Sequence, residues 1–298
     1  MIRVGPAGWS YDDWAGIVYP KPKPKGFDPL TFLAGYFGTI EVNTTFYRPA
    51  TADVAERWAE RVRDYPDFRF TAKLWRRFTH QRKEAWTRAE VREARAGLDP
   101  LAKAGRLGAV LLQFPWSFRN SDESRAWLDD LINSFGHLPL VVEVRHSSWN
   151  TPEFLDHLRE RGVGLANIDQ PLFRDSIQPS AHATSSVGYV RVHGRNYKDW
   201  WRENANPHER YDYLYSAAEL RPWIKRAKEI ARTPETEEVY VVTNNHYRGK
   251  AVANALMIES MVRKKKVVGP ADLFSEYGDL LRPFARPDRA KEPARRAS

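Results

Sequence analysis

Short apolar runs alternate with amphipathic segments along almost the whole chain. Eight of these runs are rich in aliphatic and β-branched residues, and each gap between them is long enough for a helix. The runs are Ile2–Ala7, Thr39–Asn43, Phe68–Lys73, Ala109–Phe114, Leu140–Arg145, Gly164–Asp169, Tyr189–His193 and Val239–Thr243. Because parallel strands must be joined by long crossovers, this alternation predicts eight parallel strands.

Four of the gaps contain a recognisable helix start, either a capping box or an N-cap residue followed by proline. The capping boxes are Thr87 with Glu90 and Ser216 with Glu219, and the N-cap and proline pairs are Asp28-Pro29 and Thr151-Pro152. A further helix is predicted over residues 250–262, where alanines lead into basic residues that suit a helix C-terminus. The crossover over residues 171–186 shows no helical period, so we expect irregular structure there.

Eight strands with crossovers in 298 residues predict an α/β fold, a single (β/α)8 TIM barrel with parallel strands. The alternative is an open doubly wound sheet, which usually carries a glycine-rich phosphate loop after its first strand. Gly5, Gly8 and Gly16 do not have that spacing. We expect a barrel domain over residues 1–284 and a basic, disordered tail over residues 285–298.

The amino-acid composition excludes several kinds of chemistry and shows where the charge lies. The chain has no cysteine, which excludes disulfides, thiol catalysis and cysteine-bound clusters. Its net charge is +9, of which the predicted tail accounts for +3, and further basic clusters lie at Lys21–Lys25 and Arg263–Lys266. These clusters are either a solvated surface or a contact for an anionic partner. No targeting signal and no membrane-length apolar stretch is visible, so we expect a cytoplasmic protein without membrane contact.

Polar residues gather where the predicted strands end. In four strands, two polar residues flank one aliphatic residue and therefore share a face. The pairs are Glu41 and Asn43, Glu143 and Arg145, Asn167 and Asp169, and Arg191 and His193. We expect all four pairs to point into the barrel, at the end where TIM barrels hold their active sites. Their charges nearly balance, which predicts a polar site for an anionic or hydroxyl-rich ligand.

Each type of residue in this set suggests a role. The catalytic candidates are Glu41, Glu143 and Asp169 as carboxylates and His193 as a proton carrier. The substrate-binding candidates are Lys73, Arg145, Arg191 and Arg195 for an anion, Asn43, Gln113, Asn244 and Asn245 for orientation, and Trp9, Tyr47, His80 and His246 from loops.

A divalent metal is a weaker alternative, and the sequence leaves the cofactor undetermined. Glu41, Glu143, Asp169 and His193 are suitable ligand types, but they form no local metal-binding motif and have basic neighbours. The segment from Gly194 to Tyr215 interleaves aromatic with basic residues. Such a segment either stacks on sugars or bases, or forms the small core of a long loop.

The motifs along the chain resemble those of the YecE-like family, a domain of unknown function. The matching motifs include Gly8-Trp9-Ser10-Tyr11, Glu41–Tyr47, Phe70–Lys73, Leu112–Pro115, Glu143–Trp149, Arg191–Arg195 and Asn244–His246. They occur in order from about Gly5 to Leu256. The resemblance implies a TIM barrel and leaves the reaction open, because a fold does not specify its chemistry.

Three hypotheses about function follow from these observations. The first is an enzyme of the hydrolase or lyase type that acts on a small polar ligand, anionic or containing sugar or phosphate, at the C-terminal barrel mouth. The second is a nucleic-acid-binding or nucleic-acid-processing protein, based on the net charge and the aromatic and basic segment. The third is a barrel that binds or senses a ligand without catalysis. The oligomeric state is left open.

Overall fold

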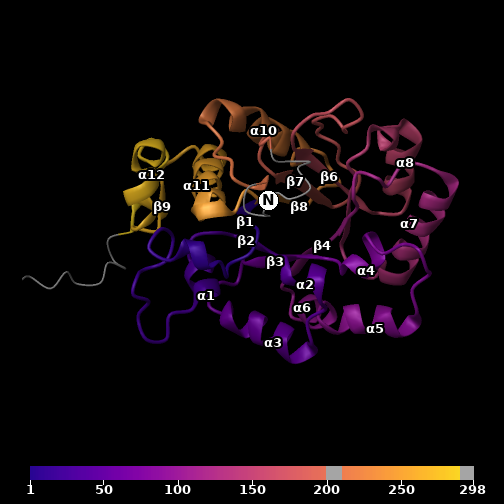
Figure 1. The fold of residues 1–298 in the computed structure, drawn as a ribbon, viewed down its shortest axis with the longest axis horizontal. Helices are drawn as coiled ribbons and strands as arrows, with labels where there is room; N and C mark the ends of the chain where they lie inside the picture. Colours follow the sequence, from indigo (N-terminus) through magenta and orange to yellow (C-terminus); the bar gives the residue numbers. More distant parts are fainter. Residues whose placement is uncertain (199–209, 289–298) are drawn as a thin grey trace, which may run out of the picture.

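The computed structural model describes residues 1–198 and 210–288, and within them eight parallel strands form a barrel. The strands are β1 Ile2–Pro6, β2 Thr39–Val42, β3 Arg69–Lys73, β4 Leu107–Gln113, β5 Leu140–Glu143, β6 Gly164–Asp169, β7 Val187–Val192 and β8 Glu238–Thr243. All eight predicted strands are confirmed, with small shifts at their ends. Figure 1 shows the strands at the centre and the helices around them.

The barrel is nearly closed between its first two strands. The sheet runs in the order β1-β8-β7-β6-β5-β4-β3-β2, so β1 and β2 must meet to complete the ring. They meet through a parallel bridge between Ala7 and Glu41, and the Gly8 amide donates to the Glu41 carbonyl at 2.8 Å. A side chain on Gly5 would place its Cβ 1.7 Å from the Thr39 carbonyl oxygen. Glycine at this position therefore allows the close approach of the two strands.

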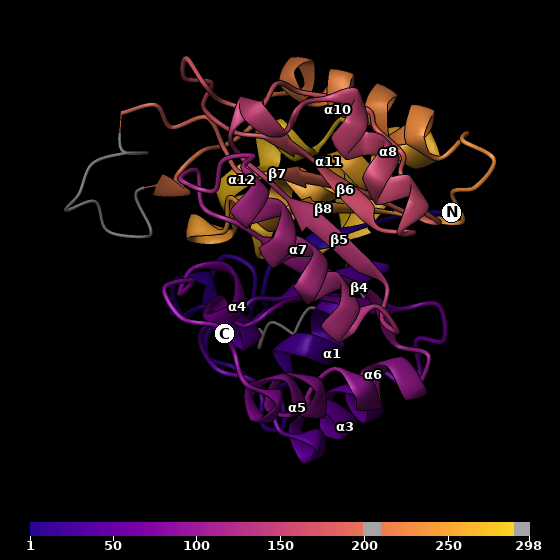
Figure 2. The ribbon, with the colours of Figure 1, turned by 90° about the vertical axis from the view of Figure 1, so that its right-hand side faces the viewer.

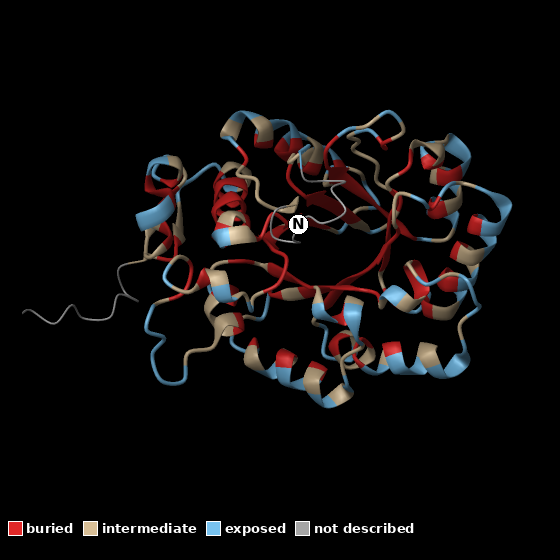
Figure 3. Ribbon diagram, viewed as in Figure 1, coloured by how far each residue is buried: buried red, intermediate tan, exposed pale blue. Residues whose placement is uncertain are grey.

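Helices cover the outside of the barrel (Figures 1 and 2). They are η1 Asp12–Trp14 and α1 Pro29–Ala34 after β1; α2 Thr44–Tyr47 and α3 Ala52–Arg61 after β2; α4 Arg76–Thr79, α5 Arg88–Ala96 and α6 Asp99–Lys103 after β3; α7 Asp122–Phe135 after β4; η2 Ser147–Trp149 and α8 Pro152–Glu160 after β5; α10 Ala217–Ile230 after β7; and η3 Tyr247–Gly249 and α11 Lys250–Arg263 after β8. The four helix starts read from the sequence are confirmed, including both capping boxes. Buried residues line the strands and the inner helix faces (Figure 3).

The crossover between β6 and β7 has no helix over residues 170–186, as the sequence predicts. The side chain of Asn167 organises this segment from the outer face of β6. Its amide donates to the His182 carbonyl at 3.0 Å, and its carbonyl oxygen accepts from Ser180 and from the His182 amide, both at 2.8 Å. A buried side chain thus supplies hydrogen bonds that a helix would otherwise make internally.

The C-terminal part of the chain adds a small second sheet. After α11 come β9 Val267–Gly269, α12 Leu273–Leu281 and β10 Ala285–Pro287, and β10 pairs in parallel with β9. The sequence places Ala285–Pro287 in the disordered tail, and this boundary is wrong because pairing with β9 is a tertiary contact that local composition does not reveal. The rest of the predicted tail, beyond residue 288, lies outside the described residues.

Strand register places polar residues at one level inside the barrel. Tyr189 lies beside Tyr240, and two residues further along each strand Arg191 lies beside Val242. On the other side of the ring, Gln113 lies beside Glu143. The interior thus passes from aromatic rings to charged groups toward the C-terminal ends of the strands. No helix in the described part of the chain is long and apolar enough to cross a membrane.

Candidate functional site at the C-terminal barrel mouth

Arg191 lies at the centre of a buried charge cluster inside the barrel. Its guanidinium meets Glu41 at two points, Nη2 to Oε1 at 2.7 Å and Nε to Oε2 at 3.0 Å. Its Nη1 donates to Glu143 Oε2 at 3.1 Å. Both carboxylates are fully buried. Burial by itself lowers the pKa of Arg191, but Glu41 and Glu143 outweigh it and raise the pKa above its usual value.

His193 completes this cluster as a neutral ring. Its Nε2 lies 3.2 Å from Glu143 Oε1, and its Nδ1 lies 3.2 Å from the Asn244 amide nitrogen. Burial lowers the pKa of His193 to about 3, against the raising effect of Glu143. A neutral ring that donates from Nε2 to Glu143 and accepts at Nδ1 from Asn244 satisfies both contacts.

Glu143 stays ionised in this setting. Burial by itself raises its pKa, but Arg191 and His193 outweigh that effect and hold the pKa well below its usual value. Arg145 adds a further contact, with Nη2 3.0 Å from Glu143 Oε1. An ionised carboxylate that faces two guanidinium groups and the N–H of His193 accepts hydrogen bonds and is a poor proton donor.

Lys73, at the end of β3, lies beside the cluster. Its Nζ donates to Gln113 Oε1 at 2.9 Å and lies 3.9 Å from the centroid of the Phe46 ring. Burial, and next the positive charge of Arg191, lower the pKa of Lys73 to about 7. The amine is therefore close to half neutral at neutral pH, unlike an exposed lysine.

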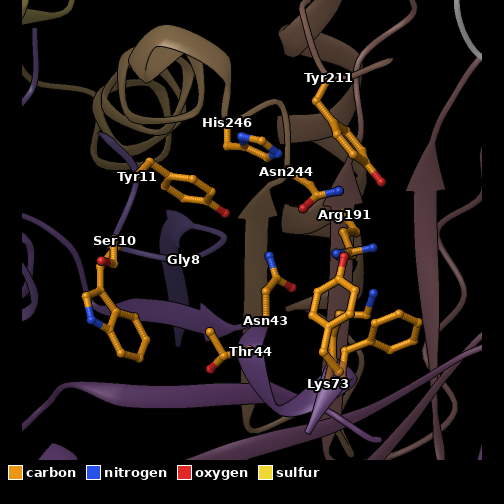
Figure 4. Close-up of a pocket in the computed structure, with 13 residues that line it drawn as sticks. Gly8, Ser10, Tyr11, Asn43, Thr44, Lys73, Arg191, Tyr211, Asn244 and His246 are labelled. Carbon is orange, nitrogen blue, oxygen red and sulfur yellow. The ribbon is translucent and has the colours of Figure 1, made fainter. Parts of the chain in front are cut away.

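A cavity of about 230 Å³ opens above these residues. Two cationic and two amide side chains in its lining, Lys73, Arg191, Asn43 and Asn244, lie at the C-terminal ends of four different strands. The remaining lining residues are Gly8, Trp9, Ser10, Tyr11, Thr44, Phe46, Tyr47, Tyr211 and His246. Figure 4 shows Tyr11 and His246 on one side of the cavity and Lys73 with Arg191 on the other.

Aromatic side chains form much of the wall. Tyr11 and His246 stack with their ring centroids 4.5 Å apart and their planes within 7°. Tyr47 is 69% exposed at the rim and packs edge-on against Phe46. Aromatic rings beside amide groups suit a ligand with both apolar and hydroxyl-bearing faces.

The structure brings seven of the predicted site residues to this cavity and places five just below or beside it. Those in the lining are Trp9, Asn43, Tyr47, Lys73, Arg191, Asn244 and His246. Four others contact lining residues from outside the lining, namely Glu41, Gln113, Glu143 and His193, and the fifth, Arg145, contacts Glu143. The side chains that line the cavity are thus distinct from the carboxylates beneath them.

Asn167 and Asp169 do not point into the barrel, so this part of the prediction is wrong. The register aligns them with Val190 and Val192 of β7, which share the outer face, whereas Ile168 aligns with the inward Arg191. β6 carries apolar residues at both alternating positions, so its pattern does not reveal its inward face. The Asp169 carboxylate instead accepts a short hydrogen bond from the Tyr215 hydroxyl and pairs with Arg195 at 2.9 Å.

Three further predicted residues also lie away from the cavity lining. His80 ends α4, where its Nδ1 lies 2.9 Å from the Thr79 hydroxyl and its ring meets Phe46 edge-on. Arg195 pairs with Asp169 on the outer side. Asn245 donates at 2.8 Å both to the Tyr213 carbonyl and to Asn254, and so ties the loop before α10 to α11.

The predicted site set omits six lining residues, which are Gly8, Ser10 and Thr44 and the three aromatic residues Tyr11, Phe46 and Tyr211. The three aromatic residues lie in segments that follow strands, which is where the sequence of a TIM barrel indicates residues around the site. Of the aromatic and basic segment from Gly194 to Tyr215, residues 199–209 lie outside the described residues.

The residues proposed for a metal do not assemble into a metal site. No group of three or more histidine and acidic side chains in the described part of the chain is placed to hold an ion. Arg191 occupies the space between Glu41 and Glu143, and Asp169 lies on the other face of the wall. Donor groups that already bind a guanidinium are poorly suited to a cation.

The fold and the cavity define a TIM-barrel protein with a polar site at its C-terminal mouth. The chain belongs to the family described as protein of unknown function DUF72, whose model matches residues 3–274. It is 30% identical over 273 residues to UPF0759 protein YunF of Bacillus subtilis (strain 168), covering 85% of this chain and 92% of that protein. The resemblance to an uncharacterised TIM-barrel family noted in the sequence is thereby confirmed.

Solved structures agree with this membership. A DUF72 family protein (TM1631) from Thermotoga maritima MSB8 is 32% identical, with a TM-score of 0.74, over 88% of this chain and 99% of that chain. A second, EF0366 from Enterococcus faecalis V583, is 24% identical, with a TM-score of 0.75, over 88% and 96%. The second likeness supports the fold alone.

Proposed function

We propose that this protein is an enzyme that acts on a small, hydroxyl-bearing ligand in the cavity at the barrel mouth. The observation that carries the proposal is the convergence of Lys73, Arg191, Asn43 and Asn244 on one cavity with aromatic walls. Buried charge clusters cost stability unless they are fully paired, and aliphatic layers would fill a barrel at lower cost. A buried charge cluster that lowers the stability of the fold is expected where it positions groups for catalysis.

The roles divide between the lining and the layer below it. Asn244 lines the cavity and its amide nitrogen contacts His193, so in this proposal its carbonyl oxygen accepts from a ligand hydroxyl. Asn43 Oδ1 is buried and makes no hydrogen bond with the described residues, and a ligand donor would satisfy it. Glu41, Glu143 and His193 hold Arg191 and Asn244 in place. A hydrolase or lyase reaction, with Lys73 and Arg191 toward any anionic group, fits this arrangement.

Calorimetric titration with a small panel tests the proposal. The panel consists of glyceraldehyde, glucose, glucose 6-phosphate, glucuronate and inorganic phosphate. We expect binding of a hydroxyl-bearing compound that weakens by about tenfold in Asn43→Leu, the cost of about one lost hydrogen bond. The matched control is Asn133→Leu, an exposed amide on α7. Absence of binding across the panel, or equal affinity in Asn43→Leu and the wild type, would contradict the proposal. Products of any bound compound are then followed by NMR.

Nucleic-acid binding is a second candidate function, because basic side chains gather on one outer surface of the protein. Arg221, Lys225, Lys228 and Arg232 are spaced by three or four residues and line a groove between α10 and Met261 of α11. The exposed cluster Arg263–Lys266 follows at the end of α11. Fluorescence anisotropy with a DNA duplex tests this candidate. Affinity should fall steeply with salt and weaken when Arg221, Lys225 and Arg232 are changed to Glu. DNA binding that is unaffected by higher salt and by the three substitutions would contradict this candidate function.

A further inference from the structure

We propose that Lys73 is a nucleophile that forms an imine with the carbonyl carbon of a hydroxylated aldehyde or ketone. This inference rests on the proposed function and makes the reaction one of the lyase kind. It differs from the role given to Lys73 both in the sequence analysis and in the proposed function, which is to bind an anionic group of the ligand, and it leaves that role to Arg191.

The position of Lys73 is the first support. Lys73 is only 9% exposed, and it is one of the residues that line the cavity. Its Nζ contacts the neutral amide of Gln113 and the ring of Phe46, and it forms no ion pair with a carboxylate of the described residues. Lys250 provides a contrast in the same chain, since it pairs directly with Asp212. An amine without a paired carboxylate is less strongly held in its charged form.

The neighbouring charges are the second support. The side chains that could hold a proton on Lys73 are Glu41 and Glu143, and both are bound to Arg191. The guanidinium of Arg191 lines the same cavity, so it repels a second cation there. Burial and this repulsion together lower the pKa of Lys73 to about 7. Desolvation and a cationic neighbour are the two means by which proteins activate a lysine nucleophile.

The step balances without an oxidant, a reductant or a cofactor. The lone pair of neutral Nζ attacks the carbonyl carbon and forms a carbon–nitrogen bond. The carbonyl oxygen then leaves with both amine protons as water, and the resulting imine takes one proton from solvent. In the protonated imine, the bond between the α and β carbons breaks and its electron pair moves toward the nitrogen to form an enamine, while the β-hydroxyl loses its proton to solvent and becomes the carbonyl of the released aldehyde. The enamine then takes a proton from solvent at the α carbon, and water hydrolyses the imine and frees the amine of Lys73. Asn43 and Asn244 are placed to bind hydroxyl groups beside the carbonyl.

Reductive methylation measures the reactivity of Lys73 directly. The full-length protein is treated at pH 7 with formaldehyde and cyanoborohydride, and peptide mass spectrometry follows the rate at each lysine. We expect Lys73 to react about tenfold faster than Lys21, Lys23 and Lys25, which are exposed. Reaction of Lys73 at or below the rate of these exposed lysines would overturn the proposal.

Trapping with glyceraldehyde and cyanoborohydride then tests imine formation with a hydroxylated carbonyl compound. We expect an adduct on Lys73 in the wild type and none at this position in Lys73→Met or Lys73→Arg, each confirmed as folded by circular dichroism. Glyceraldehyde that binds in calorimetry but gives no adduct on Lys73 overturns the imine and leaves the proposed function intact. Failure of the whole panel to bind overturns the proposed function separately, and the methylation rate still decides whether Lys73 is activated.

Discussion

Arg191 and Glu41 form a two-point ion pair inside the barrel, although 150 residues separate them in the chain. The pair joins β7 to β2 across the interior, and both side chains are buried, at 1% and 0% exposure. Because the same guanidinium also binds Glu143, one cation neutralises part of two carboxylates. The cluster therefore forms a rigid base under the cavity and presents little free carboxylate to a ligand.

Replacement of Arg191 by Met should destabilise the protein strongly. The change leaves Glu41 and Glu143 buried without their shared partner, which typically costs about 3–5 kcal/mol. Chemical denaturation of the wild type and Arg191→Met measures this difference. Arg63→Met is the control, because Arg63 pairs with Glu60 on the surface with both side chains more than half exposed, and its loss should cost less than about 1 kcal/mol. Equal effects of the two changes would contradict a structural role for the buried pair.

The contribution of Glu143 to stability should depend on pH in one direction. Its folded pKa lies well below the usual 4.5, so its stabilising effect is complete above the unfolded pKa and declines as the pH falls below it. Glu143→Gln should therefore be less stable than the wild type at pH 7, and the gap should narrow below about pH 4.5. Denaturation at a series of pH values measures the gap. A gap that stays constant from pH 7 to pH 3 would be inconsistent with this pKa.

Lys73 should produce a dependence of the same sign, but at alkaline pH. Its pKa is about 7 in the folded protein against 10.5 when unperturbed, so between these values the unfolded chain holds more protons. Stability therefore rises with pH across this window in the wild type. Relative to Lys73→Met, the wild type should gain stability between pH 7 and pH 10. Parallel pH profiles for the two proteins would show that the pKa of Lys73 is not lowered.

A single added methyl group at the contact between β1 and β2, where the barrel closes, should lower the stability of the protein. In Gly5→Ala the new Cβ would lie 1.7 Å from the Thr39 carbonyl oxygen, and backbone must move to relieve this overlap. We expect a loss of about 1–3 kcal/mol or more. Gly38→Ala is the matched control, because its Cβ would meet Arg3 at an ordinary 3.6 Å. Thermal unfolding of both variants measures the difference. Similar melting temperatures would argue against a close contact between β1 and β2.

Much of the fold could be predicted from local patterns. The strand between Gly164 and Asp169 matches its predicted bounds, and the capping boxes at Thr87 and Ser216 start helices where expected. Local hydrogen bonds and periodicity encode these features, so neighbouring residues suffice to reveal them. The short strand Ala285–Pro287 escaped prediction because it forms only by pairing with a distant partner.

The candidate site could be predicted in part. The alternation around Glu41, Glu143 and Arg191 correctly indicates that these side chains point inward, because their neighbours in the strand are clearly apolar. The same reasoning failed at Asp169, where apolar residues occupy both faces of the strand and only the register with β7 decides the direction. Tyr11 and Phe46 reach the cavity from the segments that follow β1 and β2, and the positions of these segments are not set by strand periodicity.

The sequence by itself determined the number of strands, the parallel barrel and the end of the barrel at which polar residues collect, because these depend on patterns within single segments. Only the tertiary structure decided which of the polar residues neutralise each other and which line the cavity. The pairing of Arg191 with Glu41 and Glu143 brings together three strands. That pairing leaves Lys73 without a carboxylate partner in the described residues, and so gives it the character of a buried amine rather than of an ordinary surface cation.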